Sequence, residues 1–515
     1  MRQVRRKTMD TAARDYLLKA KNEGLQLSWN KYEAMLPQDG FSQIGLSCHE
    51  CLQGPCRLNP FRPGEKSTVC GLGNDELVLI WLTRQAGENH ELIAAGSQML
   101  AELKNKVSVG EVASDLLQLK AAKWSVNGTD LSYLVMGLSL KFAELTYPRA
   151  QQSKTSNIDD LMTLGTQQIN LVGFNADLAE VLYGKYSSQS RLVGLGVIRE
   201  KAVNICLDGA SPLLLAKVFE LRNELEGEAI QLGASDGLNI VLAGDFSSNF
   251  GFNTSCNQGT IEFAVLTGLV DLYLIEDGLG KGRIPAAGYH TVLATAVSTK
   301  EALKEVFMQG IAAYSQRNLK KVKVSNQVEK AEAVSDINPL GIKSLLDQGL
   351  INGICVIGGG SNLKLTEDQG NLDLARKLSF QKVLCLTYGN SAVTLAKYGC
   401  LNSERLENKV LADELEGEAT PLICSVGGEG DAAKLIEVFG AVGREKVVAV
   451  FPELTSARDL QMALALAQTG AKVFTGVKLP VAGSVKISEE IGKVIEYSKP
   501  KDLADTVAKC FGVQE

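Results

Sequence analysis

The chain has 515 residues, of which 45% are hydrophobic and 22% are charged, as in an average soluble globular protein. This length predicts roughly two to four domains, each able to bury its own core. The net charge of −6 is spread without long runs, which argues against nucleic acid or an anionic membrane as a partner. Because no apolar run could span a bilayer and no hydrophobic signal segment follows the basic start Arg2 to Lys7, we expect a cytoplasmic protein.

The first part of the chain is predicted to be helical. An amphipathic pattern from residue 10 to about residue 35 begins at Asp10, a good helix cap, and a second helix is expected after Asn74 and Asp75. Apolar residues keep a helical spacing as far as about residue 186. The segments with this spacing are 115–119, 131–146 and 158–182. We therefore predict a helical domain over residues 1–200.

Beyond residue 200, short apolar segments that end in Gly, Asp or Ser alternate with helical ones. Such strands are typical of parallel sheets covered by helices on both faces, so the predicted fold class is α/β. The predicted strands lie within 203–209, 229–235, 238–245, 270–278, 352–360, 382–390, 421–430, 447–453 and 471–477. Because they are too many for one sheet, we place a break at 318–338. This gives two Rossmann-like domains, 201–335 and 336–515, the second ending in a helix over 500–511.

Ligands of parallel sheets collect at the carboxyl ends of the strands, where these Gly-rich turns lie. The turn Gly358 to Gly360 does not complete the glycine pattern of a dinucleotide site, so it is weak evidence for nucleotide binding.

Four of the eleven cysteines lie within the segment Ser47 to Gly71, with the spacing C-x2-C-x4-C-x13-C. They are Cys48, Cys51, Cys56 and Cys70. Clustered thiols in a long chain without a secretory segment indicate metal ligands rather than disulfides. Four thiolates suit either a zinc ion or a 4Fe-4S cluster, and chance clustering of buried thiols is the third interpretation. Three crowded cysteines and a remote fourth favour iron and sulfur over the paired knuckles of a zinc site.

The residues around these cysteines resemble the cluster-binding segment of nickel–iron carbon monoxide dehydrogenases, a family related to the hybrid-cluster (prismane) proteins. The segment is GFSQIGLSCHECLQGPCRLNPF…VCG at 40–71, and shorter matches continue in the same order to PVAGS at 480–484. The resemblance implies a helical domain followed by two Rossmann-like domains. It also implies a homodimer, with one 4Fe-4S cluster on the four cysteines of each subunit.

The same resemblance predicts which other clusters are absent. The family's second cluster bridges two subunits through a pair of cysteines, and Asp39 and Ser47 stand at the matching positions. The catalytic nickel–iron–sulfur cluster needs one His and five Cys, and none of the six is kept. The matching positions lie at 207–210, 242–245, 276–278, Gly360, Asn390 and Gly427. Because soft thiolates hold such a cluster, we expect neither nickel nor carbon monoxide oxidation.

The residues at the replaced positions predict a remodelled pocket instead. Carboxylates and an amide supply polar groups there, and glycines are expected to open volume for a ligand. The predicted pocket residues are Asp208, Asp245, Asp277, Gly360, Asn390 and Gly427. Such a pocket would bind an organic ligand or a different metal centre. The alternative is decay of the site, with the domains kept as a scaffold.

Three functions remain open at this point. The favoured one is an electron-transfer or assembly subunit of a larger anaerobic redox complex, which keeps one 4Fe-4S cluster and exchanges electrons with a ferredoxin-like protein or another redox subunit. The second is an oxidoreductase with a remodelled active site, for which hydroxylamine reduction by hybrid-cluster relatives is the nearest precedent. The third is a non-redox scaffold or ligand-binding protein. A homodimer or a hetero-oligomer is expected in each case.

Overall fold

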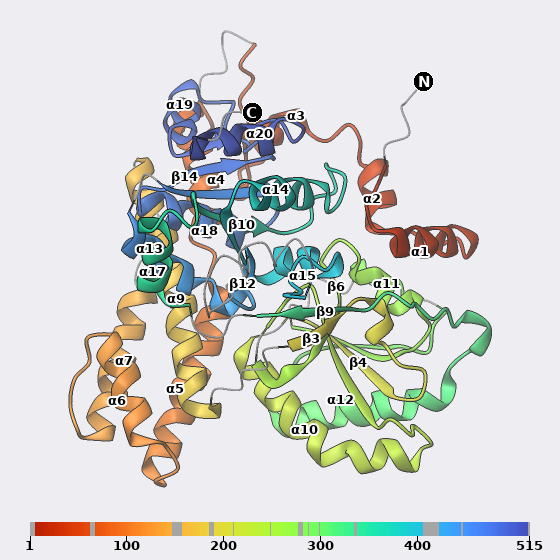
Figure 1. The fold of residues 1–515 in the computed structure, drawn as a ribbon. Coiled ribbons are helices and arrows are strands. Elements are labelled where there is room, and N and C mark those ends of the chain that lie inside the picture. The colour runs from red at the N-terminus through yellow and green to blue at the C-terminus, as the bar shows by residue number, and fades with distance from the viewer. Residues whose placement is uncertain are drawn as a thin grey trace.

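The computed structural model describes residues 6–61, 67–146, 157–184, 190–209, 211–247, 249–276, 282–286, 288–297, 299–333, 337–404, 422–443 and 446–512. A bundle of helices packs beside two mostly parallel sheets, one drawn above the other in Figure 1. The fold class is therefore α/β, and the order of the parts is the one predicted from the sequence.

The helices of the first part follow the predicted segments. Asp10 caps the first helix by accepting hydrogen bonds from the backbone amides of Ala12 and Ala13. The cap expected at Asn74 lies one residue earlier, because the Gly73 amide donates to the carboxylate of Glu76. The helices are α1 (Thr11–Asn22), α2 (Ser28–Ala34), α3 (Gly40–Gln43), α4 (Asn74–Ala86), α5 (His90–Ser108), α6 (Ser114–Lys123), α7 (Leu131–Thr146) and α9 (Ile158–Tyr183).

These helices do not all belong to one bundle. Helices α5, α6, α7 and α9 surround their own apolar core at the lower left of Figure 1. Helix α1 instead packs beside the first sheet, where the rings of Tyr16 and Trp29 stack on Phe263 with centroid distances of 5.8 and 5.9 Å. The amino-terminal residues thus cover the first sheet rather than the bundle.

The first sheet has seven strands in the order β8-β7-β4-β5-β6-β3-β9. They are β3 (Ser190–Val193), β4 (Val203–Asp208), β5 (Leu238–Ala243), β6 (Asn253–Cys256), β7 (Val270–Ile275), β8 (Val292–Thr295) and β9 (Glu329–Glu332). Neighbouring strands are parallel except β3 and β9, which are antiparallel with Ser190 opposite Glu332. The helices of this region are α10 (Pro212–Gln231), α11 (Ile261–Leu266) and α12 (Lys300–Ala313).

The strand predicted at 229–235 is wrong. Its first residues are the last turn of α10, which begins at the Ser211 cap with Pro212 in its first turn. Ala229 is buried against the sheet, whereas Ile230 and Leu232 are about half exposed. The short apolar segment therefore reflects one buried face of a helix and not a strand.

The second sheet has six parallel strands in the order β12-β11-β10-β13-β14-β15. They are β10 (Gly353–Gly359), β11 (Val383–Thr387), β12 (Ile423–Ser425), β13 (Val447–Glu453), β14 (Lys472–Thr475) and β15 (Ile495–Tyr497). The helices are α13 (Pro339–Asp347), α14 (Gln369–Phe380), α15 (Gly389–Lys397), α17 (Ala433–Val442), α18 (Ala457–Gln468), α19 (Val485–Gly492) and α20 (Leu503–Ala508). The chain adds strands on one side of β10, and then crosses to add β13 on the other side.

Helix α18 joins the helical part to the second sheet. It packs along α9, where Gly165 allows close approach: a Cβ at this position would lie 2.7 Å from Leu464 Cβ. The side chain of Gln461 donates to the carbonyl of Gln85, in the last turn of α4, and to that of Glu88, just beyond this helix. The two sheets also touch at their edges, through a β-bridge between Ala333 and Ser425.

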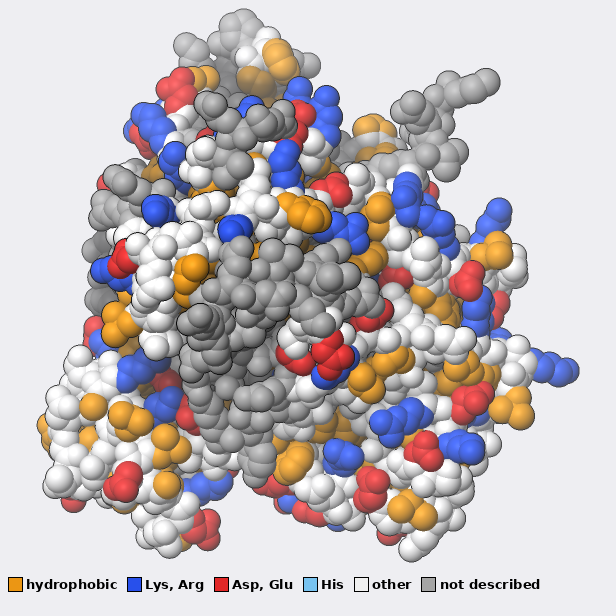
Figure 2. All heavy atoms as spheres, viewed as in Figure 1, with side chains coloured by type: hydrophobic (Ala, Val, Ile, Leu, Met, Phe, Trp, Pro, Cys, Tyr) orange, Lys and Arg blue, Asp and Glu red, His pale blue; other side chains and the backbone are white. Residues whose placement is uncertain are grey.

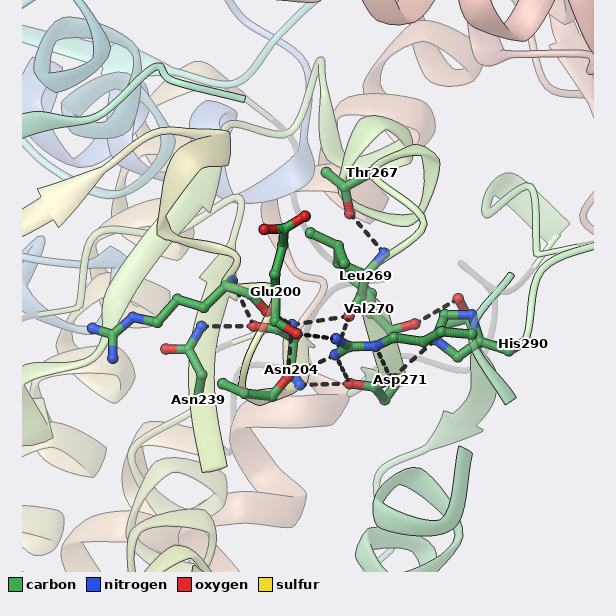
Figure 3. Close-up of polar contacts among 12 residues, drawn as sticks. Glu200, Asn204, Asn239, Thr267, Leu269, Val270, Asp271 and His290 are labelled. Carbon is green, nitrogen blue, oxygen red and sulfur yellow. Dashed lines mark hydrogen bonds and ion pairs between the residues drawn. The ribbon is translucent and has the colours of Figure 1, made fainter. Parts of the chain in front are cut away.

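A buried charged cluster ties together the amino ends of β4 and β7 (Figure 3). Asp271 is fully buried. Its carboxylate accepts hydrogen bonds from Arg317 Nε at 2.8 Å and from the backbone amide of Asn204 at 2.7 Å. His290 Nε2 lies 3.0 Å from the same carboxylate, and Arg317 also donates to the Leu269 carbonyl. This cluster lies at the end of the sheet opposite the strand ends expected to carry function, and it assigns His290 a structural role.

No helix in the described part of the chain is both long and apolar enough to cross a lipid bilayer.

Candidate functional site

The first candidate site is the cysteine loop. Cys48 and Cys56 are register partners in the antiparallel pair of β1 (Ser47–Cys48) and β2 (Cys56–Arg57), so their Cα atoms lie about 5 Å apart. The connecting turn is closed by the Gly54 amide, which donates to the Cys51 carbonyl. Cys48 is buried in the same core as α4, whereas Cys51 and Cys70 are exposed.

The segment that carries Cys70 is held by Thr68. Its hydroxyl lies 3.3 Å from Cys70 Sγ and accepts from the Leu72 amide, and the Thr68 amide donates to the Leu72 carbonyl. Residues 62–66, which connect this segment to β2, lie outside the described residues. The structure therefore places Cys70 on a turn separate from the β1–β2 pair.

The donor chemistry of the loop suits a metal centre with thiolate ligands. The four cysteines of the loop form no disulfide bonds. Within the described ranges, no three His, Cys, Asp or Glu side chains are placed to hold one metal ion. Four thiols can bind either a zinc ion or a 4Fe-4S cluster.

Large apolar side chains are exposed next to the cysteines in the sequence. Leu52 follows Cys51 and is fully exposed, Val69 precedes Cys70 with 71% of its surface exposed, and Phe61 is 90% exposed. Soluble proteins seldom expose several large apolar groups on one short segment without a partner for them. The cysteine loop thus exposes both thiols and large apolar side chains, as a surface that contacts a partner would.

The second candidate site lies where the carboxyl ends of the two sheets face each other. Asp245 follows β5, Gly360 follows β10, Asn390 lies in the first turn of α15, and Gly427 follows β12. Asp208 is the last residue of β4, where the buried Tyr273 hydroxyl donates to its carboxylate at 3.1 Å. The sixth predicted pocket residue, Asp277, lies outside the described residues.

The predicted residues Asn390 and Asp245 take part in hydrogen bonds that cross between the two sheet regions at this place. The backbone amide of Gln258 donates to Asn390 Oδ1 at 2.6 Å, and the backbone amide of Glu429 donates to Asp245 Oδ1 at 2.9 Å. Asn390 and Asp245, both predicted from the sequence, therefore contact the opposite domain. Gln258, which sequence reasoning missed, completes one of these contacts.

Protein side chains take up the space beside the glycines of this region. A Cβ at Gly360 would lie 2.8 Å from Gln258 Oε1, and one at Gly427 would lie 2.2 Å from Asp431 Oδ2. A Cβ at Gly428 would lie 2.6 Å from Asp245 Oδ2. Because these positions are glycines, the space that a side chain would take is filled by the polar side chains of neighbouring residues.

The carboxylates of this region are hard to ionise. Burial raises the pKa of Asp245 to about 6, although the Glu429 amide opposes the shift. Burial, followed by the charges of Asp245 and Asp459, raises the pKa of Glu429 to about 8. The Tyr388 hydroxyl and Glu429 Oε2 are buried without a hydrogen-bond partner among the described residues. The site therefore has polar groups that could bind or protonate a small ligand.

No protein-family model matches the sequence. Among characterised proteins, the chain is 24% identical to carbon monoxide dehydrogenase 2 of Carboxydothermus hydrogenoformans, over 94% of this chain and 92% of that one. It is 24% identical to the carbon monoxide dehydrogenase of Rhodospirillum rubrum, over 96% of both chains. It is also 23% identical to the carbon monoxide dehydrogenase/acetyl-CoA synthase subunit beta of Moorella thermoacetica, over 93% of this chain and 87% of that one.

Solved structures with the same fold are also of carbon monoxide dehydrogenases. Carbon monoxide dehydrogenase IV from Carboxydothermus hydrogenoformans superposes with a TM-score of 0.84 over 99% of both chains, at 22% identity. A nickel-free carbon monoxide dehydrogenase from Thermococcus sp. AM4 also gives 0.84, over 98% of this chain and 96% of that one, at 20% identity. The chain is therefore a divergent homologue of the carbon monoxide dehydrogenases and shares their fold over nearly its whole length.

Proposed function

We propose that this chain is an electron-transfer or assembly subunit that holds one 4Fe-4S cluster and does not oxidise carbon monoxide. The contrast between its two candidate sites carries this proposal. The amino-terminal loop keeps four free thiols, whereas the residues between the sheets that match cluster ligands are carboxylates, amides and glycines packed against one another.

The cluster would be held by Cys48, Cys51, Cys56 and Cys70, and when bound it would accept and release single electrons. The Thr68 hydroxyl, 3.3 Å from Cys70 Sγ, is placed to donate a hydrogen bond to that sulfur. Donors to a cluster sulfur stabilise the reduced, more negative state and so raise the reduction potential.

The partner would dock on the cysteine loop. Leu52, Phe61 and Val69 supply exposed apolar groups beside the thiols, which would bring a redox partner close to the cluster. A ferredoxin-like protein, another redox subunit or a second copy of the chain would suit this surface. One relative is named as a subunit of a larger enzyme, which is consistent with such a role. An oxygen-sensitive cluster with exposed thiol ligands also fits a reducing, anaerobic cytoplasm.

The filled space between the sheets argues against a nickel–iron–sulfur cluster there. To enter, such a cluster would have to displace Gln258, Asp245 and Asp431, whose atoms stand within 3 Å of the Cβ positions at three glycines. The displaced carboxylates are also poor ligands for the soft metals of that cluster.

The first test is metal analysis and EPR of protein purified without oxygen. We expect about four iron and four sulfide per chain, no nickel, an EPR signal on dithionite reduction, and no carbon monoxide oxidation. The variants Cys51→Ser and Cys70→Ser should lose most of the iron. Cys510→Ser, which alters a half-buried thiol in the carboxyl-terminal turn, should retain it. Stoichiometric nickel, or protein with no iron after anaerobic purification, would reject the proposal.

The second candidate function is an oxidoreductase with its own remodelled site at Asp208, Asp245, Asp277, Gly360, Asn390 and Gly427. The buried, unpartnered Tyr388 hydroxyl and Glu429 Oε2 favour it, because such groups are costly unless a ligand or water satisfies them. Hydroxylamine with reduced viologen as donor is the substrate to test first, and turnover that Glu429→Gln abolishes would establish it. If neither iron nor turnover is found, the non-redox scaffold or ligand-binding role remains.

A further inference from the structure

The amino-terminal segment, residues 6–10, is attached beside the second sheet through Glu367. The backbone amide of Glu367 donates to the Lys7 carbonyl at 3.0 Å, and the backbone amide of Met9 donates to the Glu367 carbonyl at 3.2 Å. Helix α1, which follows directly, packs beside the first sheet instead (Figure 1). The segment therefore runs from one sheet to the other, and Glu367 is its attachment point beside the second.

A loop from the first sheet closes on the same side chain. The loop 257–259 follows β6, and a Cβ at Gly259 would lie 2.1 Å from Glu367 Oε1. The middle residue of this loop, Gln258, donates its backbone amide to Asn390 at the second candidate site. The loop that contacts Glu367 thus also forms one of the contacts between the two sheet regions.

Four carboxyl groups and one ammonium group are buried together at this junction. They are Asp10, Glu367, Asp368, Glu453 and Lys397, and none of them is more than 4% exposed. On the face drawn in Figure 2, by contrast, charged side chains of both signs are scattered over the surface. Lys397 Nζ lies 2.8 Å from Asp368 and 3.3 Å from Asp10, so these two carboxylates share its charge.

The carboxyl group of Glu367 has no cation of its own. Neither of its oxygens has a hydrogen-bond partner among the described residues. A third buried carboxylate beside one ammonium group would be an uncompensated charge, which is costly in a protein interior. Accordingly, burial, followed by the charge of Asp368, raises the pKa of Glu367 to about 8, although the charge of Lys397 and the Thr8 hydroxyl oppose the shift.

The other titratable groups at the junction do not supply a counter-charge. Burial raises the pKa of Glu453, and that of Tyr398, whose hydroxyl donates to Asp368 at 2.9 Å. Neither group can carry a positive charge. Glu367 therefore fits the closed junction in its protonated form.

We propose that Glu367 is a pH-sensitive latch, which holds residues 6–10 and the loop 257–259 together when it is protonated and releases both when it ionises. On release, the proton passes to the solvent and water reaches the carboxylate, while Asp10, Asp368 and Lys397 keep their charges. The contact between Gln258 and Asn390 loosens with the loop. The latch does not depend on the iron–sulfur cluster or on the function proposed above.

The direction of the pH effect follows from the two states of the latch. In the open state Glu367 is exposed and titrates at about 4.3, whereas in the closed state its pKa is about 8. Between these values the closed state keeps a proton that the open state has lost. The closed state is therefore favoured most below about pH 4.3, and the opening constant rises by up to about tenfold per pH unit until about pH 8.

The test is hydrogen–deuterium exchange of the full chain at pH 6, 7 and 8, read by mass spectrometry and corrected for the intrinsic exchange rate at each pH. We expect the protection of residues 6–13 to fall at least tenfold between pH 6 and pH 8. Glu367→Gln, which has the shape of the protonated side chain, should abolish this fall. Glu305→Gln, which changes an exposed carboxylate on α12, should leave it unaltered. Helix α7, away from the junction, should keep its protection throughout.

Three outcomes would overturn the proposal. The first is protection of residues 6–13 that does not change with pH in the unaltered chain, a comparison that holds even if Glu367→Gln fails to fold. The second is an equal fall in the unaltered chain and in Glu367→Gln. The third is an equal fall in α7, which would mean that the whole molecule opens. Because Cys51→Ser should show the same fall as the unaltered chain, the result is independent of whether the iron–sulfur cluster forms.

Discussion

The buried carboxyl group of Glu429, at the second candidate site, makes the free energy of unfolding depend on pH. Its pKa is about 8 in the folded protein, whereas an unfolded Glu titrates at about 4.3. Between these values the folded protein keeps a proton that the unfolded chain has lost. The stabilisation is therefore complete below about pH 4.3 and is lost as the pH rises to about 8, by up to about 1.4 kcal/mol per pH unit.

We expect Glu429→Gln to remove this part of the pH dependence, because the amide does not ionise. Urea unfolding at several pH values should show the variant becoming more stable than the unaltered chain by a few kcal/mol, about 2 or more, as the pH rises from 5 to 8. Glu489→Gln, which changes an exposed carboxylate on α19, should leave the slope as it is. A Glu429→Gln curve parallel to that of the unaltered chain would show that Glu429 ionises freely.

At the residue scale, the sequence predicts what can be recognised from spacing or from position at a strand end. The four loop cysteines stand out because thiols are rare and close together. Asp245 and Asn390 stand out because they follow buried strands. Gln258 carries no such signal, because its role depends on a contact with the opposite domain. His290 likewise gains its partner, Asp271, only when the sheet forms.

At the element scale, every long and fully buried strand was found from the sequence, as were the shorter β11, β12 and β14. Strands β4, β5, β7, β10 and β13 have six or seven residues each, and nearly all of these are buried. The missed strands are short or polar; β6 reads NTSC and β9 reads EKAE. Their pairing with neighbours, rather than their own hydrophobicity, makes them strands. The domain boundaries at 200 and 335 stay predictions.

The contact between α9 and α18 gives a prediction at the same scale. Gly165→Ala places a Cβ 2.7 Å from Leu464 Cβ, so the helices must move apart. We expect a loss of about 1–3 kcal/mol in the free energy of unfolding despite the better helix propensity of Ala. Gly227→Ala in α10 has open space around the new Cβ and should stabilise the protein by up to about 1 kcal/mol. Chemical denaturation compares the two, and equal effects would mean that α9 and α18 do not pack closely at Gly165.

At the scale of the whole molecule, the exposed apolar groups of the cysteine loop set an expectation for assembly. We expect the double variant Leu52→Glu, Phe61→Glu to sediment as a smaller species, or to lose its redox partner, while it keeps its iron and its melting temperature. Charges on an apolar contact surface oppose docking but cost little on a free surface. Leu119→Glu on α6 changes a side chain that is 67% exposed and should leave assembly intact. Unaltered sedimentation and electron transfer in the double variant would place the contact elsewhere.

The bridge between Ala333 and Ser425 brings the edge strands β9 and β12 of the two sheets against each other. Unpaired edge strands are templates on which other chains add strands and aggregate. A gene truncated after residue 335 would yield a protein whose β9 edge has lost its cover, and the complementary fragment would expose β12. We therefore expect each half, expressed alone, to form insoluble material more readily than the intact polypeptide.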